Sequence, residues 1–162
     1  GFIFVGRLEP GKGIVQLLEL WSSLPAHFTL TVVGSGELAS QLKKSFNQSN
    51  INFLGDLPFS RVSELLAQAK FCIHPSLYYE TFGLVILEAM ARGTPVIGLP
   101  FGTRLDWIQH GVNGFLETFD TLKDRLEKLD EINYSIMSEE SIKTAQAFYP
   151  ERVAQQSLVI YK

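Results

Sequence analysis

Short, continuously apolar segments alternate with segments of helical length along the chain, and this alternation limits the folds that are open to it. The clearest apolar segments are Phe2–Val5, with the sequence FIFV, and Phe28–Val33, which ends in LTVV. Strands that are apolar at every position belong to parallel sheets covered by helices on both faces. We therefore predict an α/β fold, a Rossmann-like doubly wound parallel sheet, in a single domain over residues 1–162.

The expected elements alternate between strand and helix, and two helices close the chain. The expected strands are Phe2–Val5, Phe28–Val33, Ile51–Leu54, Phe71–His74, Pro95–Gly98 and Gly114–Leu116. The expected helices are Ile14–Leu24, Glu37–Gln48, Ser60–Gln68, Gly83–Arg92, Thr103–Gln109, Thr121–Leu129, Ser138–Phe148 and Pro150–Tyr161. Ligands of such sheets bind beyond the carboxyl ends of the strands, so we expect the site in the loops that follow them.

The segment Tyr79–Gly98, YETFGLVILEAMARGTPVIG, carries two acidic residues around the start of an expected amphipathic helix. Glu80 falls in the loop before the helix, and Glu88 falls in its second turn, where a side chain leans back toward the N-terminus. The free backbone N–H groups and the positive dipole end between them suit a phosphate esterified to polyhydroxy groups, as in a nucleotide sugar. The plainer alternative is that both acids only stabilise the helix dipole. Thr81 would either contact phosphate or cap the helix.

A second candidate site follows the first strand, in a loop that contains Gly6, Gly11 and Gly13. Glycines allow the backbone to approach a ligand closely, and Arg7 and Lys12 could flank a diphosphate from the same loop. The plainer alternative is a pair of solvated surface cations.

The loop after the second strand has the pattern G-x-G-x-x-A, formed by Gly34, Gly36 and Ala39, with Asp56 near the end of the next strand. This pattern imitates a dinucleotide-binding fingerprint and keeps an NAD-type dehydrogenase open as an alternative. The pattern follows the second strand rather than the first, and no residues suited to hydride transfer accompany it. A dehydrogenase is therefore the less favoured interpretation.

Charge and apolar patterning argue against several other classes. The net charge of −3 and the pI near 5.6 do not fit a nucleic-acid surface. No apolar run approaches the roughly 18 residues that a membrane span needs, and the N-terminus lacks the pattern of a signal peptide. Membrane contact is thus not evident, and we expect a cytoplasmic protein.

The cysteine and histidine content predicts no metal site. Cys72 is the single cysteine, lies in the apolar run FCI and is expected to be a buried, inert thiol. His74 has no partner at metal-ligand spacing, so we expect a structural role for it. The sequence contains no Asp-x-Asp pair, and we expect no metal and no cofactor other than a nucleotide-sugar substrate.

The Tyr79–Gly98 segment resembles the donor-binding signature of retaining glycosyltransferases of the GT-B fold, especially family 4. The opening loop VGRLEPGKG (Val5–Gly13) is similar to that family's diphosphate-binding loop. Leu30–Glu37 (LTVVGSGE), Ile51–Leu57 (INFLGDL) and Asp106–Leu116 (DWIQHGVNGFL) also match in order and spacing. The chain departs from the family pattern in three places: Thr103 and Arg104 replace its more usual Gly-hydrophobic pair, and Asp106 stands where the family often has Glu.

The resemblance implies that the chain is one half of a GT-B enzyme, the donor-binding C-terminal domain of a retaining hexosyltransferase. Its donor would be a UDP- or GDP-sugar. The acceptor, a sugar or lipid-linked glycan such as polysaccharide biosynthesis uses, would contact an N-terminal domain that we expect to be missing, so the chain alone should bind the donor but not turn it over.

The family's residue roles can be carried over position by position. In the family the first glutamate contacts hydroxyls of the transferred sugar, the second contacts the ribose, and the loop cations neutralise the leaving group. The resemblance thus implies Arg7, Lys12 and Glu80 for catalysis, and Gly6, Arg7, Lys12, Gly34, Gly36, Glu80, Thr81, Phe82, Gly83, Leu84 and Glu88 for binding the nucleotide sugar. A GT-B-fold epimerase acting on UDP-GlcNAc and a non-catalytic nucleotide-binding module stay open as alternatives.

Overall fold

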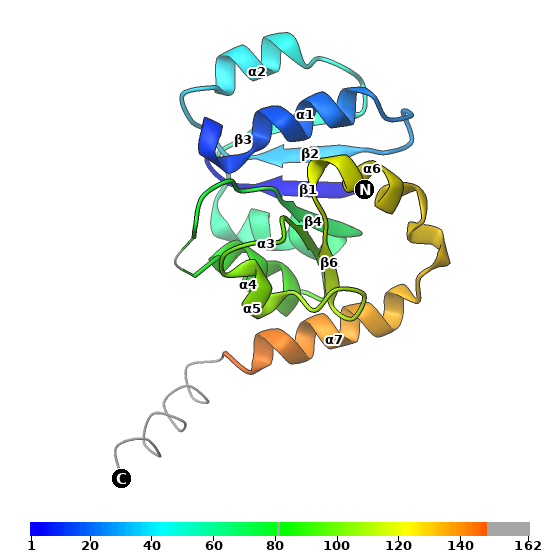
Figure 1. The fold of residues 1–162 in the computed structure, drawn as a ribbon. Helices are drawn as coiled ribbons and strands as arrows, with labels where there is room; N and C mark the ends of the chain where they lie inside the picture. The colour runs from blue at the N-terminus through cyan, green and yellow to red at the C-terminus, as the bar shows by residue number, and fades with distance from the viewer. Residues whose placement is uncertain (81, 149–162) are drawn as a thin grey trace.

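A single parallel sheet forms the centre of the computed structural model, which describes residues 1–80 and 82–148 (Figure 1). Its strands are β1 (Phe2–Val5), β2 (Leu30–Val33), β3 (Ile51–Gly55), β4 (Phe71–His74), β5 (Val96–Gly98) and β6 (Gly114–Leu116). Their order across the sheet is β3-β2-β1-β4-β5-β6, and every pairing is parallel. This is the order of a doubly wound Rossmann sheet, and it confirms the predicted fold class.

Helices cover both faces of the sheet. They are α1 (Ile14–Ser22), α2 (Ala39–Ser45), α3 (Phe59–Gln68), α4 (Leu84–Ala91), α5 (Arg104–Trp107), α6 (Phe119–Glu127) and α7 (Tyr134–Gln146), with short 3₁₀ turns at Pro10–Lys12 and Leu129–Glu131. The helices α1, α2 and α6 pack on one face, and α3, α4 and α5 pack on the other, while α7 contributes Met137 to the first core and Ala145 to the second. The helix expected at Pro150–Tyr161 lies outside the described residues.

The alternation of side chains along each strand divides the core into two layers. In β1, Phe2 and Phe4 belong to the core under α1 and α6, whereas Ile3 belongs to the core under α3 and α4. All three side chains are nearly inaccessible to solvent. Because both faces of the strand are buried, every position has to be apolar, which is the pattern from which the sheet was predicted.

The helix α4 differs from the amphipathic helix that the sequence analysis expected. Its inner residues Ile86, Ala89 and Met90 are fully buried, and α7 packs along its outer side. Leu87 and Ala91 pack against the same core cluster. A second layer of helix therefore removes the solvated face, which makes the helix apolar on most sides.

The loop after β2 packs closely against the loop after β1. The backbone N–H of Leu8 donates to Ser35 (2.7 Å), and the N–H of Leu38 donates back to the carbonyl of Leu8 (3.0 Å). Gly34 has a φ of +124°, and a Cβ on it would lie 2.0 Å from the carbonyl oxygen of Gly6. The glycine at position 34 is thus required by the approach of two backbones, whether or not a ligand is present.

We expect that Gly34→Ala lowers the free energy of unfolding by about 3 kcal/mol or more, because it combines left-handed backbone strain with a backbone clash. Gly55→Ala is the matched control, since Gly55 has a φ of +72° but nothing within 4 Å of its Cβ position. The control should cost only about 1 to 2 kcal/mol of backbone strain. Urea unfolding measures both, and equal losses would contradict the packing role of Gly34.

Candidate functional site

The candidate site lies where the order of the strands reverses. The chain moves outward from β1 to β2 and β3, and then returns to start β4 on the other side of β1. The loops that leave the carboxyl ends of β1 and β4 therefore diverge onto opposite faces of the sheet and leave a crevice between them. The first loop contains the predicted Arg7 and Lys12, and the second contains the predicted Glu80.

The two loops are held together by backbone packing. The N–H of Leu77 donates to the carbonyl of Gly11 (2.8 Å), and the ring of Tyr78 lies against the same glycine. A Cβ on Gly11 would fall 1.8 Å from the ring carbon Cζ of Tyr78. Only glycine leaves room for this contact, so the pattern of glycines in the first loop positions the two loops relative to each other.

An ion pair joins the two loops across the crevice. The ammonium Nζ of Lys12 lies 2.6 Å from the carboxylate Oε1 of Glu80, and the two side chains are only 20% and 16% exposed. They lie 68 positions apart in the chain. Two predicted site residues are thus brought into direct contact by the fold.

Glu80 also faces His74, the last residue of β4. The ring nitrogen Nε2 of His74 lies 3.7 Å from the same oxygen, Oε1. Hydrogen bonding to His74, and to a smaller extent to Lys12 and Ser76, holds the pKa of Glu80 well below its ordinary value. Burial of the carboxylate acts in the opposite direction. By distance the Lys12 contact is the closer of the two. The carboxylate is therefore ionised and prepared as a hydrogen-bond acceptor.

Gly6, Arg7, Lys12, His74, Ser76 and Glu80 line a small cavity at the mouth of the crevice, which we call the loop cavity. Arg7 is 74% exposed, and its guanidinium lies 3.0 Å from Glu9. The structure thus brings both predicted cations to one cavity. The Lys12 ammonium is paired with Glu80 of the other loop, whereas the Arg7 side chain extends into solvent beside Glu9 of its own loop.

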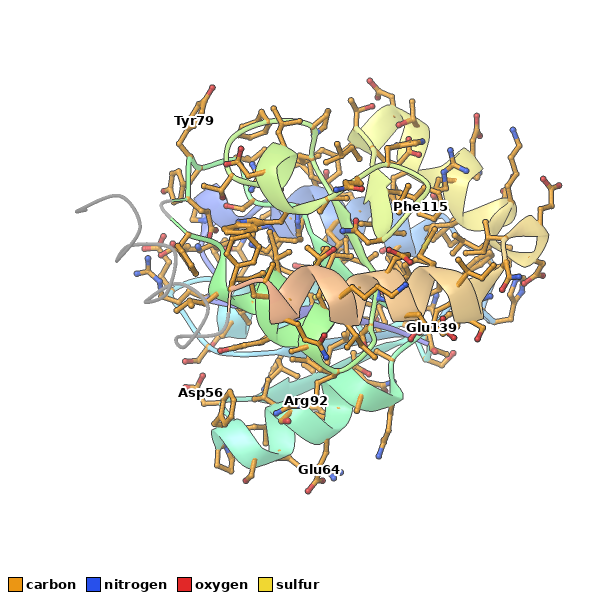
Figure 2. All side chains as sticks on the ribbon, turned by 90° about the horizontal axis from the view of Figure 1, so that it is seen from below. Asp56, Glu64, Tyr79, Arg92, Phe115 and Glu139 are labelled. Carbon is orange, nitrogen blue, oxygen red and sulfur yellow. The ribbon has the colours of Figure 1, made fainter. Side chains whose placement is uncertain are left out.

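A second and wider cavity, of about 550 Å³, opens beside the first and is called the aromatic cavity here. Lys12, Glu80 and Val85 belong to both cavities, and Tyr78, Tyr79, Phe82, Gly83 and Leu84 complete the wider one. Tyr79 is 82% exposed and projects outward (Figure 2). Gly83 takes a φ of +69° just before the first turn of α4, and Gly83, Leu84 and Val85 line this opening, so the N-terminus of the helix lies at it.

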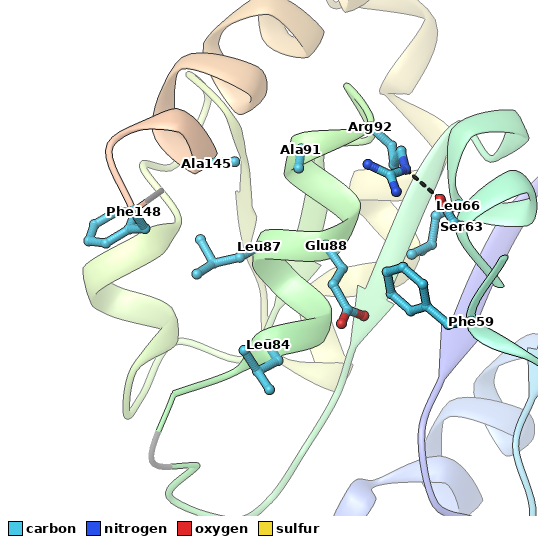
Figure 3. A pocket seen from close by; sticks show the side chains of 10 residues that line it. All are labelled: Phe59, Ser63, Leu66, Leu84, Leu87, Glu88, Ala91, Arg92, Ala145 and Phe148. Carbon is cyan, nitrogen blue, oxygen red and sulfur yellow. Dashed lines mark hydrogen bonds between the residues drawn. The ribbon is translucent and has the colours of Figure 1, made fainter. Parts of the chain in front are cut away.

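Glu88 lies in a third depression, which we call the helix groove, between α3, α4 and the end of α7 (Figure 3). Its carboxylate turns toward Phe59 of α3, while Leu87 lies on the α7 side. Burial raises the pKa of Glu88, and the charge of Arg92 partly opposes this. Leu84 lines both the helix groove and the aromatic cavity, so the depressions that hold the two glutamates adjoin at this residue.

The remaining predicted site residues are Phe82, the two glycines of the loop after β2, and Thr81. Phe82 packs edge-on against Trp107, which also donates a hydrogen bond to its carbonyl (2.9 Å). Gly34 and Gly36 are engaged by the first loop, and Asp56 accepts a hydrogen bond from Ser35, so the dinucleotide-like pattern has a structural explanation. Thr81 lies outside the described residues.

The structure adds two residues that the sequence analysis did not assign to the site. His74, for which we expected a structural role, contacts Glu80, and Arg104 lies behind His74 with its Nη1 3.4 Å from the ring nitrogen Nδ1. Burial lowers the pKa of Arg104, and the charge of Glu80 opposes this. The place of His74 at the carboxyl end of the strand next to the reversal was the signal that could have identified it.

Cys72 behaves as the sequence predicted. It is fully buried, and burial, with a smaller effect from Glu88, raises the pKa of its thiol to about 12. Such a thiol is almost entirely protonated at neutral pH and is a poor nucleophile. Among residues 1–80 and 82–148, no helix is long and apolar enough to cross a membrane.

Residues 2–147 match the family of glycosyl transferases group 1. The chain belongs to this family. It is 32% identical over 145 residues to an uncharacterized glycosyltransferase of Methanocaldococcus jannaschii, a match that covers 88% of this chain and 40% of that protein. It is 35% identical over 123 residues to a GDP-mannose-dependent alpha-mannosyltransferase of Corynebacterium glutamicum, covering 76% of this chain and 29% of the relative.

Among solved structures, the Anabaena protein HepE in complex with UDP-glucose has the same fold, with a TM-score of 0.83 and 28% identity. The match covers 96% of this chain and 46% of HepE. The chain thus spans less than half of the length of each of these glycosyl transferases. Membership of the group 1 family confirms the resemblance to GT-B glycosyltransferases, and the residue roles carried over from it stay predictions.

The opposite pKa directions of Glu80 and Glu88 predict opposite effects on stability. The lowered pKa of Glu80 contributes stability that is complete above the ordinary Glu value of 4.5 and is lost as pH falls below it. The raised pKa of Glu88 costs stability at neutral pH, and this cost disappears as pH falls toward 4.5. Glu80→Gln should therefore destabilise the protein at pH 7, and Glu88→Gln should stabilise it.

Urea unfolding of both variants between pH 3 and pH 8, with the wild type alongside, measures these differences; the pH limits bracket roughly the ordinary carboxyl range. As pH falls below 4.5, the loss in unfolding free energy caused by Glu80→Gln should become smaller. The gain caused by Glu88→Gln should become smaller earlier, as pH falls from neutral toward 4.5. Curves that run parallel to the wild type would show that neither carboxylate is perturbed.

Proposed function

We propose that this chain is the donor-binding domain of a retaining glycosyltransferase that uses a nucleoside-diphosphate sugar. The observation that carries the proposal is the contact of Lys12 with Glu80 at the strand-order reversal, between the loop cavity and the aromatic cavity. A cation and an ionised carboxylate side by side suit a ligand whose phosphate adjoins a sugar hydroxyl.

The adjoining cavities supply places for each part of such a donor. The diphosphate would lie in the aromatic cavity, against Lys12 and the N-terminus of α4, with Arg7 reaching it from the loop cavity. The sugar would lie in the loop cavity, with hydroxyl groups donating to Glu80. The ribose would pass over Leu84 and donate to Glu88 in the helix groove.

The proposed chemistry is transfer of a hexose with retention of configuration. Negative charge develops on the departing diphosphate as the bond to the sugar breaks. Lys12, Arg7 and the N–H groups of α4 would stabilise that charge from fixed positions, which lowers the barrier to transfer. We propose that these groups act without a metal ion, and that the acceptor contacts a domain beyond this chain.

The known ligands of similar proteins support a nucleotide sugar as the donor. HepE was solved with UDP-glucose, and the Corynebacterium relative depends on GDP-mannose. The matched family is one of glycosyl transferases, which favours a transferase over an epimerase, a dehydrogenase or a module that only binds nucleotides. UDP, UDP-glucose, GDP and GDP-mannose are accordingly the first probes.

The division of roles between the two glutamates can be tested by calorimetry with a nucleoside diphosphate and its sugar. Glu88→Ala should weaken the binding of UDP and of UDP-glucose about equally, because both ligands carry the ribose. The same should hold for GDP and GDP-mannose. Glu80→Ala should weaken only the complete donor, by about ten- to a hundredfold, the loss of one charged hydrogen bond. Because this variant also frees Lys12, the diphosphate alone should bind as well or more tightly. Equal weakening of both ligands by both variants would contradict this division.

The leaving-group role of the loop cations can be tested by kinetics on the full-length protein. Lys12→Ala should raise the barrier of the chemical step by about 2 to 4 kcal/mol. Arg7→Ala should have the smaller effect, because Arg7 is mostly exposed and is paired with Glu9. EDTA should leave the rate unchanged. A wild-type rate in both variants, or strict dependence on a divalent metal, would overturn the assignment of this loop.

A further inference from the structure

Arg104 is fully buried at the start of α5, and it is a departure from the family pattern. Its guanidinium stacks over the ring of Phe101 at 4.3 Å and donates to the carbonyls of Leu99 (3.0 Å) and Tyr78 (3.4 Å). In the part of the chain that the structure describes, no carboxylate lies within ion-pair distance of it. Burying a cation without a direct counter-charge costs free energy of folding, so the hydrogen bonds that compensate the Arg104 guanidinium are important.

The remaining contact of Arg104 determines the tautomer of His74. An arginine side chain has only donors, so the nitrogen Nδ1 of His74, 3.4 Å from Nη1, has to be the acceptor. A neutral imidazole that accepts at Nδ1 carries its proton on Nε2. Nε2 is the nitrogen that faces the carboxylate of Glu80, at 3.7 Å. The N–H dipole is thereby directed at the negative charge.

The opposite tautomer would place a lone pair toward the carboxylate and a proton toward the guanidinium. Both contacts would then be repulsive, at the centre of the proposed sugar site. Arg104 itself touches neither the loop cavity nor the aromatic cavity, since its side chain is covered by Phe101, His74 and the backbone. Any influence on the ligand therefore passes through His74.

We propose that Arg104 is a positioning residue that holds His74 as the Nε2–H tautomer, so that His74 and Lys12 together orient the carboxylate of Glu80 toward the donor sugar. This inference rests on the proposed function of Glu80. Lys12 and His74 both lie on the Oε1 side of the carboxylate, and a sugar hydroxyl would donate to Oε2. Arg104 would then affect recognition of the sugar and leave recognition of the diphosphate unchanged.

The tautomer can be observed directly, without any ligand, by long-range ¹H–¹⁵N NMR of the histidine rings. The chain has three histidines, and His27→Gln and His110→Gln identify the signals of His74 by elimination. We expect a pyridine-type shift for Nδ1 and a pyrrole-type shift for Nε2. In Arg104→Met this preference should be lost. An Nδ1–H tautomer in the wild type, or an unchanged spectrum in Arg104→Met, would overturn the proposal.

Binding measurements test the consequence for the donor, with UDP and UDP-glucose (or GDP and GDP-mannose) as probes. Arg104→Met should weaken the sugar nucleotide by about three- to tenfold, a loss of about 0.7 to 1.4 kcal/mol, and leave the diphosphate within about twofold. Equal weakening of both ligands would show that Arg104 acts only through the fold. If the wild type binds neither nucleotide, the proposed function fails, while the NMR result still decides the tautomer.

Arg125 supplies a matched control. Its guanidinium stacks over Phe115 at the same 4.3 Å and donates to Glu117 (2.7 Å), yet it lines none of the three cavities of the site. Arg125→Met should reduce stability but change neither the His74 spectrum nor the affinity for either ligand. Arg104→Lys provides a second variant if Arg104→Met does not fold. Because lysine keeps a donor, it should retain the tautomer and part of the sugar affinity, and loss of both would contradict the proposal.

Discussion

The pairing of β1 with both β2 and β4 is the constraint on which the rest of the structure depends. The chain winds outward from β1 in one direction and, after β3, in the other, so the loops after β1 and β4 leave neighbouring strands toward opposite faces. The crevice between them is a consequence of topology and does not depend on any one side chain. What the side chains add is its chemistry, a lysine from one loop and a glutamate from the other.

The ion pair between Lys12 and Glu80 connects the free protein to the proposed donor complex. Each side chain is mostly shielded from water, so each would be costly to bury without the other. A donor would replace this single contact with two, because its phosphate can satisfy the lysine and its sugar hydroxyls can satisfy the carboxylate. The free site therefore already holds both charged groups at the crevice, and a donor would exchange their mutual contact for contacts of its own.

Local signals explain how well the elements were predicted and where their ends were missed. The strands β1, β4 and β6 match their predicted bounds, since each is an apolar run that ends at a polar or turn residue. The helix α7 begins at Tyr134, earlier than predicted, because the side chain of Asn133 accepts from the N–H of Ile136 and caps it. The helix α2 begins only at Ala39, because the residues before it pack against the first loop.

The sequence by itself determined the fold class, the loops that hold the site, and Lys12, Glu80 and Glu88 as candidate residues, because apolar strands and the residues that follow them are local patterns. Only the tertiary structure decided that Glu80 faces His74 and Lys12 while Glu88 occupies a separate groove beside α3. Only it could show Arg104 as a buried partner of His74, 30 positions away. Burial, tautomer and ion pairing are set by neighbours that are distant in the chain, and a linear pattern does not contain them.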